Sequence, residues 1–111
     1  HAGGLLGALF ESLATLTVRV LAQTAEATTS HLRTDRGRHE IDLIVEGHDG
    51  RCVGIEVKLT TAPGDADVRH LLWLRETVPE RIADLVILTT GEYAYRRRDG
   101  VAVVPLGLLG P

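Results

Sequence analysis

The sequence predicts an α/β domain whose elements follow the order α-β-β-β-α-β around a mixed central sheet. Three observations predict it. Apolar residues recur at three- and four-residue spacing across the opening segment, as they do on an amphipathic helix. Two later segments alternate apolar and charged residues, which is typical of half-buried strands. Residues 85–88 are a short apolar run, Leu-Val-Ile-Leu, as in a buried central strand.

The first helix is expected over residues 4–25, where the polar stretch 24–30 ends it. Its apolar positions form one broad stripe: Leu5, Leu6, Leu9, Phe10, Leu13, Leu16, Val20 and Leu21. Glu11 lies almost opposite this stripe, on a face of small residues such as Gly7, Ala8 and Ala14. A face of small residues suggests close approach to the sheet, which would leave the Glu11 carboxylate partly buried and in need of a partner.

Three strands are expected next, over residues 31–34, 38–46 and 51–60, with a turn at residues 35–37 and a hairpin loop from Gly47 to Gly50. Alternation assigns two faces to each of the last two strands. On the second strand, one face carries Ile41, Leu43 and Val45, and the other carries Glu40, Asp42 and Glu46. On the third strand, one face carries Val53, Ile55, Val57 and Leu59, and the other carries Glu56 and Lys58.

The second half of the chain predicts a crossover. Pro63 and Gly64 end the third strand, and Asp65 is a reasonable N-cap for a second helix that reaches about residue 77. Its inward positions are Val68, Leu71, Leu72 and Trp73. The strand at 85–88, a polar loop at 91–100, a short strand at 101–104 and a terminal helical turn at 105–109 follow. A meander of three strands followed by a crossover helix gives mixed pairing.

Length and composition limit the functions that remain. A chain of 111 residues is expected to form a single domain, residues 1–111. The formal net charge of −3 gives no general attraction to nucleic acid. One cysteine excludes an intrachain disulfide and fits a reducing, cytoplasmic location. The opening helix is apolar, but Glu11 near its middle and the lack of a basic leader argue against a membrane span or signal peptide. The absence of methionine indicates a fragment of a longer protein.

The predicted hairpin brings Asp42, Glu56 and Lys58 to one surface. Two carboxylates and an ammonium on adjacent strands can hold a divalent cation and act on a phosphodiester. A solvated charged face is the competing interpretation, since cross-strand Glu–Lys pairs are common. Glu11 supplies a third carboxylate, with the alternative that it meets solvent or pairs with an arginine.

Basic residues give weaker signals. Arg33, Arg36 and Arg38 flank the first turn and could meet a phosphate backbone, although scattered solvated arginines are the favoured interpretation. The run at residues 96–98 is interpreted as ordinary surface.

This order of elements resembles the PD-(D/E)xK nuclease superfamily, with Glu11 on the first helix, Asp42 on the second strand and Glu56-Val57-Lys58 on the third. The resemblance implies a restriction-endonuclease-like core. The chain is also similar, over nearly its whole length, to the C-terminal domain of a family of prokaryotic ATPases, DUF4143. The segments that carry this similarity are GLLGALFESL, LRTDRGRHEIDLIVE, GIEVKLT, DVRHLLWLRE and LVILTTGEYAYRRRDGVAVVPLGLL.

The resemblance implies a mechanism and a partner. Asp42, Glu56 and the Val57 carbonyl would bind Mg2+ or Mn2+, while Lys58 would orient water or offset charge on phosphate, and Glu11 would complete the metal shell through water. His70 occupies a helix where this fold sometimes adds an auxiliary residue, and a packing or surface histidine is the simpler interpretation. An upstream P-loop ATPase domain is implied, although this chain contains no Gly-x-x-x-x-Gly-Lys-[Ser/Thr] motif.

Three functional hypotheses follow. The first is a metal-dependent nuclease domain acting on DNA, favoured because all four charged signature positions are present. The second is a catalytically silent module that serves the ATPase as an interaction or regulatory domain. The third is a structural domain that forms a homo-oligomer through its apolar first helix.

Overall fold

The computed structural model describes residues 2–109, with side chains for residues 4–34 and 36–109, so residues 1, 110 and 111 of the predicted domain lie outside it. Its α-helices are α1 (Ala2–Thr24) and α2 (Arg69–Thr77). Its strands are β1 (Thr28–Arg33), β2 (Glu40–Glu46), β3 (Cys52–Val57), β4 (Ile82–Thr89), β5 (Tyr95–Arg96) and β6 (Ala102–Pro105). Its short 3-10 turns are η1 (Asp35–Gly37), η2 (Asp65–Val68), η3 (Pro79–Arg81) and η4 (Leu106–Leu108).

The strands form one mixed sheet in the order β1-β2-β3-β4-β6-β5. The β1–β2, β2–β3 and β5–β6 pairs are antiparallel, whereas β3–β4 and β4–β6 are parallel. The prediction of an α/β domain with a mixed sheet is therefore confirmed. The predicted loop at 91–100 is wrong in one detail, because Tyr95 and Arg96 pair with β6 as a short edge strand.

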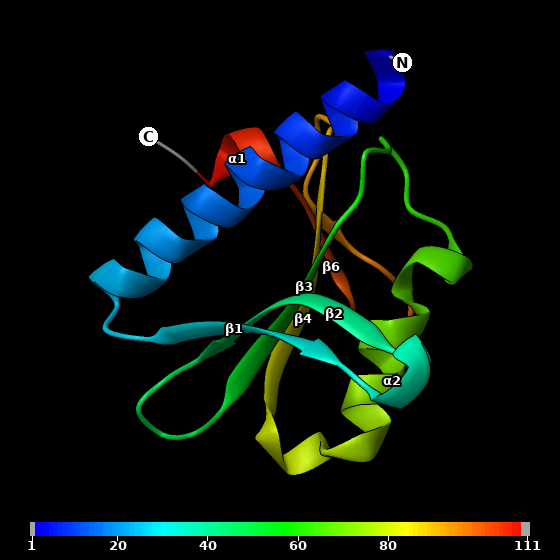
Figure 1. Cartoon of the computed structure of the whole chain (residues 1–111). Coiled ribbons are helices and arrows are strands. Elements are labelled where there is room, and N and C mark those ends of the chain that lie inside the picture. The colour runs from blue at the N-terminus through cyan, green and yellow to red at the C-terminus, as the bar shows by residue number, and fades with distance from the viewer. Residues whose placement is uncertain (1, 110–111) are drawn as a thin grey trace.

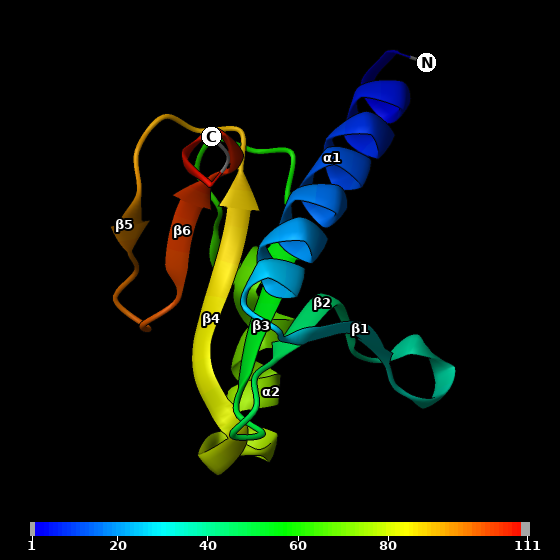
Figure 2. The same cartoon turned by 90° about the vertical axis from the view of Figure 1, so that its left-hand side faces the viewer.

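The two helices cover opposite faces of the sheet (Figures 1 and 2). The core under α1 consists of Ala14, Val18, Leu43, Ile55, Val57, Leu88 and Leu106. The core under α2 consists of Ile41, Val68, Leu71, Leu74, Leu85, Ile87 and Val101. Because both faces are covered, Glu56 is buried rather than displayed on a solvated charged surface, whereas Glu40 and Glu46 remain exposed.

A bulge on β2 overturns the predicted face of Ile41. The β1–β2 register shifts between Ser30 and Leu32, so that β2 spans one more residue than β1 over this interval. Ile41 consequently packs in the core under α2, while Leu43 packs under α1. The extra residue reverses the alternation locally, as bulges do next to functional sites.

Three predicted boundaries also differ from the structure. β1 begins at Thr28, within the polar stretch that was expected only to end the helix. β3 ends at Val57 rather than at residue 60, so Lys58 follows the strand and Leu59 is 51% exposed instead of buried. The residue that caps η2 is Gly64, whose N–H donates to Asp67 Oδ2 at 2.8 Å, and not Asp65.

The first helix packs through its small residues. Ala14, Val18 and Ala22 are buried against the rest of the domain, as the sequence suggested for this face. The leucines of the opposite stripe point away from the sheet and are more than 40% exposed. By length and composition, residues 4–24 could cross a membrane, with a mean hydropathy of 1.6, but this helix is packed on the sheet.

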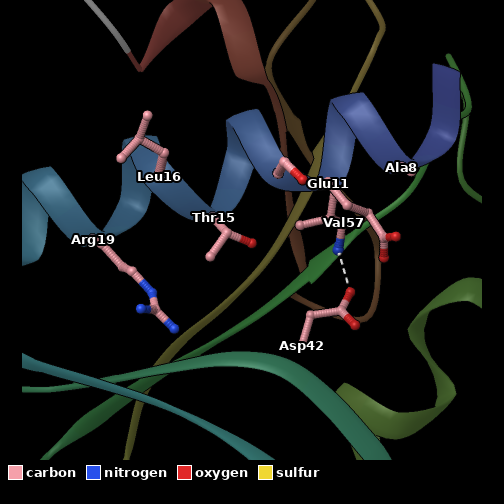
Figure 3. A pocket seen from close by; sticks show the side chains of 8 residues that line it. Ala8, Glu11, Thr15, Leu16, Arg19, Asp42 and Val57 are labelled. Atoms are coloured by element: carbon pink, nitrogen blue, oxygen red, sulfur yellow. Dashed lines mark hydrogen bonds between the residues drawn. The ribbon is translucent and has the colours of Figure 1, made fainter. Parts of the chain in front are cut away.

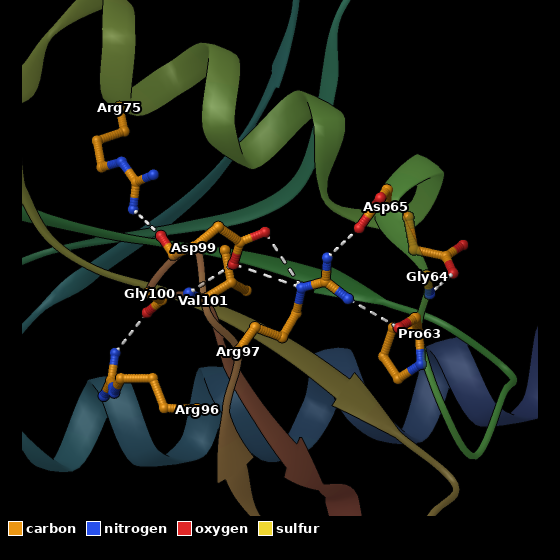
Figure 4. A network of polar contacts seen from close by, with 10 residues as sticks. Pro63, Gly64, Asp65, Arg75, Arg96, Arg97, Asp99, Gly100 and Val101 are labelled. Carbon is orange, nitrogen blue, oxygen red and sulfur yellow. Dashed lines mark hydrogen bonds and ion pairs between the residues drawn. The ribbon is translucent and has the colours of Figure 1, made fainter.

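Two residues of the arginine run, Arg96 and Arg97, are structural, whereas Arg98 is exposed as predicted (Figure 4). Arg97 donates to Asp65 Oδ1 at 2.6 Å and to the Pro63 carbonyl at 2.9 Å, and its Nε lies 3.2 Å from Asp99 Oδ2. Its side chain is only 15% exposed. Arg96 makes a two-pronged contact with Asp84, and this hydrogen-bonded pair lowers the pKa of the Asp84 carboxyl. The β5–β6 turn is thereby fastened to η2 and β4.

Candidate functional site

The site lies where β2 and β3 stop pairing. Their ladder runs from Glu46 opposite Cys52 to Leu43 opposite Ile55, which places Asp42 and Glu56 just beyond its last pair. The Val57 N–H donates to Asp42 Oδ2 at 2.8 Å, so the Asp42 carboxylate replaces a backbone partner on the neighbouring strand. This bond fixes Asp42 between the two strands.

Glu56 is the buried member of the site. Its residue is 4% exposed, and its Oε1 atom has no hydrogen-bond partner among the described residues. Burial first, and then the hydrogen-bonding contact and charge repulsion from Asp42, together raise the pKa of Glu56 to about 9. Two carboxyl groups in contact therefore retain a proton in the absence of a cation.

Lys58 adds the nearest positive charge. Its backbone N–H donates to the Leu88 carbonyl at 2.9 Å, which holds the residue after β3 against β4. Its ammonium opposes the rise in the pKa of Glu56. The pKa of His70 is lowered by burial, then by Arg69 and His39, and to a smaller extent by Lys58. Lys58 thus acts electrostatically on both the carboxyl pair and α2.

Glu11, on α1, approaches Asp42 from the helix that covers this face of the sheet. A pocket of about 690 Å³ lies between α1 and the sheet, and Glu11, Asp42 and Val57 all line it. Figure 3 shows Glu11 and Asp42 pointing into this pocket, with Arg19 two turns further along α1. Glu11 itself is exposed, which differs from the expectation of a partly buried carboxylate.

Asp42 is the residue that connects the predicted set. It contacts Glu56 on one side and shares the pocket with Glu11 on the other. Within residues 2–109, no group of three His, Cys, Asp or Glu side chains is close enough to hold a metal ion together. A cation would therefore have two side-chain ligands, Asp42 and Glu56, with a backbone carbonyl and water completing its shell. Two carboxylates, one of which has a buried oxygen without a hydrogen-bond partner, fit a hard divalent ion whose remaining ligands are a carbonyl and water.

Sequence reasoning missed a second cluster next to the site. His39 stacks on Trp73 with ring centroids 4.1 Å apart and an interplanar angle of 6°. Its Nδ1 also lies 3.2 Å from His70 Nδ1, so His70 has a specific partner rather than a plain surface position. No spacing rule would have paired His39 with a helix 31 residues later. Arg19, in contrast, lies eight residues after Glu11, and helical periodicity could have placed it on the same face.

The three arginines of the first turn divide into two kinds. The guanidinium of Arg33 lies 3.0 Å from the Glu40 carboxylate and is engaged in that ion pair. Arg36 and Arg38 are exposed and line a pocket of about 460 Å³ with Thr34, His39 and Trp73. Arg36 has a φ of 61°, a left-handed conformation that is uncommon for a residue with a side chain.

The comparisons with known proteins gave one match. A family model described as "Domain of unknown function (DUF4143)" matches residues 6–109. No curated protein and no solved structure matches the chain. The family match spans α1 from residue 6 onward, α2, the whole sheet and all the site residues described above.

Proposed function

The chain belongs to the DUF4143 family, and from this premise and the site geometry we propose that it is a Mg2+- or Mn2+-dependent phosphodiesterase domain acting on DNA. One observation carries the proposal. The buried Glu56 carboxyl contacts Asp42 at the point where β2 and β3 separate, with Lys58 two residues further along. Two carboxyl groups forced together in a buried position favour a divalent cation, which neutralises both.

Each residue has a role in this proposal. Asp42 and Glu56 hold the cation together with the Val57 carbonyl, and Glu11 holds water across the pocket that it shares with Asp42. The cation, when bound, supplies a Lewis acid for the scissile phosphate and a more acidic water. Lys58 orients that water and offsets negative charge that develops on the phosphate. His70 is the auxiliary residue of this proposal, on the helix beside Lys58, and it does not contact the phosphate.

Arg36 and Arg38 supply a place for the DNA backbone. Both are exposed cations on a loop that is held in place by contacts of its neighbouring residue His39. The His39 N–H donates to Thr34 Oγ1 at 3.0 Å, and the His39 ring stacks on Trp73 of α2. A rigid loop that presents guanidinium groups suits phosphate contacts, which position a duplex without reading its sequence. Arg33 contributes less because Glu40 already neutralises it.

A second candidate function has its own support. The described residues contain no three-ligand metal cluster, and Glu11 and Glu56 are connected only through Asp42. This arrangement favours a nuclease-fold module that does not cut and instead regulates an ATPase domain of the same protein. Under this alternative the chain binds no divalent cation, and variants with alanine at Glu11, Asp42 or Glu56 behave as the wild type does in metal-binding and cleavage assays.

A cleavage assay separates the two candidates. We expect nicking or cutting of DNA in Mn2+ or Mg2+ that is abolished by EDTA, by Asp42→Ala and by Lys58→Ala. Glu76→Ala, which removes an exposed carboxylate on α2, is the matched control and should cleave like the wild type. Circular dichroism verifies that each variant is folded. Cleavage that survives both Asp42→Ala and Lys58→Ala would refute the assigned site, and no cleavage by the wild type would favour the silent module.

A further inference from the structure

The outer face of α1 carries a continuous apolar seam. Its members are Leu6, Leu9, Leu13, Leu16 and Val20, which are 52–61% exposed. Their spacing along the helix is three, four, three and four residues. This is the a/d repeat of a coiled coil, in which every a and d position of two successive heptads is apolar. Leu5 and Leu21, at 63% and 43% exposed, extend the same face.

The seam contains no charge. The described part of α1 has two charged residues, Glu11 and Arg19, and both line the pocket on the sheet side of the helix, which Leu16 of the seam borders at its rim (Figure 3). Ala14, Val18 and Ala22 occupy the face that packs on the sheet. The helix is therefore arranged with its small residues inward and its large residues outward. Domains that remain monomers rarely expose an apolar surface of this extent.

We propose that this seam is a homodimer interface, in which α1 of one chain packs against α1 of a second copy as a two-helix coiled coil. A two-fold contact brings the same patch of both chains together, and an uncharged patch does so without like-charge repulsion. The sheet covers the opposite side of α1, so each chain presents only one seam. Assembly through this seam therefore stops at a dimer.

The size of the seam is close to what a stable dimer needs. If the seven exposed side chains each remove roughly 90 Å² from water, each chain buries about 600 Å², near the ~800 Å² per partner of standard interfaces.

A membrane surface is the less suitable occupant. Helices that lie on membranes carry lysine and arginine along the polar face that flanks their apolar face. α1 has one such residue, Arg19, and that residue faces the pocket. The face opposite the leucines is occupied by the sheet rather than by headgroups.

The test is the mass of the chain in solution, measured by sedimentation equilibrium over a wide concentration range. We expect the wild type at twice its 12.0 kDa mass. Leu13→Glu places two carboxylates in the centre of the dimer, and we expect the dissociation constant to rise by at least about 100-fold. Leu9→Glu, on the same seam, should act alike. Tyr93→Glu introduces the same charge at a side chain that is 77% exposed elsewhere, and it should leave the dimer intact.

Folding is monitored separately, so that loss of the dimer is not confused with loss of structure. Leu13 is 55% exposed, and circular dichroism of Leu13→Glu should match that of the wild type. A wild type that is monomeric at all concentrations overturns the proposal, and so does a monomer that floats with phospholipid vesicles. A dimer that persists in both seam variants also overturns it. None of these outcomes depends on cleavage or metal binding, so the proposed function is tested independently.

Discussion

Replacing Glu56 with glutamine should stabilise the chain at neutral pH in the absence of metal. The pKa of Glu56 is raised from 4.5 to about 9 by burial and by Asp42. Between these values the folded chain holds a proton on Glu56 that the unfolded chain releases. The unfolded state therefore binds fewer protons, and the free energy of unfolding must fall as pH rises through this window.

The magnitude follows from the same shift. Each pH unit above the ordinary pKa removes about 1.4 kcal/mol of stability, because one proton must be taken up on folding. At about pH 7.5, roughly three units above that value, the penalty is on the order of 4 kcal/mol. Glutamine has the shape of the protonated acid and can donate to Asp42 as that acid does, so Glu56→Gln should avoid the penalty.

Urea denaturation in EDTA at a series of pH values is the appropriate assay. The wild type should lose stability steadily from about pH 5 to pH 8, whereas the slope attributable to Glu56 should be absent in the glutamine variant. At about pH 5 the two proteins should be nearly equal. Parallel pH profiles for the two proteins would refute the reasoning, since they would mean that Glu56 ionises normally in the folded chain.

Three further outcomes test other parts of the structure. Arg97→Ala should lower the free energy of unfolding, measured by urea denaturation, by about 2–3 kcal/mol, because Asp99 and Asp65 lose a partly buried cation. Its control, Arg98→Ala at an exposed side chain, should change this free energy by less than about 0.5 kcal/mol. Gly54→Ala should destabilise by about 1–3 kcal/mol, since its Cβ would lie 3.0 Å from a leucine Cδ2. Gly107→Ala, whose Cβ would meet nothing within 4 Å, is its control. Arg36→Ala should reduce the slope of log affinity for DNA against log salt by about 1 in a fluorescence anisotropy titration. An unchanged slope would exclude a phosphate contact there.

Much of the fold could be predicted from local patterns. The Gly47–Gly50 loop forms as expected, with the Gly50 N–H donating to the Gly47 carbonyl at 3.0 Å. The apolar run at residues 85–88 is the centre of β4, which lies between two parallel neighbours. These features depend on residues that are close in sequence, where period and turn chemistry act directly.

Other features depend on contacts that no local pattern contains. The reversed face of Ile41 results from a bulge, and a one-residue bulge leaves the amino-acid composition of a strand unchanged. The stripe of leucines on α1 is visible in the sequence, yet its outward direction is decided by the small residues that fit the sheet. The periodicity of a helix identifies its faces without saying which face is buried.

The candidate site shows the same division. Strand alternation brought Glu56 and Lys58 to one face, but it suggested solvent rather than burial, because the covering helix comes later in the chain. Asp42 was predicted as a site residue, whereas its bond to the Val57 N–H depends on where the β2–β3 ladder ends. The stack of His39 on Trp73 depends on the packing of α2 and had no signal in the sequence.

The most direct measurement of the central claim is a calorimetric titration of the chain with Mn2+. Asp42 and Glu56 predict one binding site per chain in the wild type, with binding lost in Asp42→Ala and in Glu56→Gln. Glu76→Ala, far from the site in sequence and exposed on α2, should bind as the wild type does. A wild type that takes up no Mn2+, or variants that take up as much as the wild type, would contradict the claim that these two carboxyl groups hold a cation.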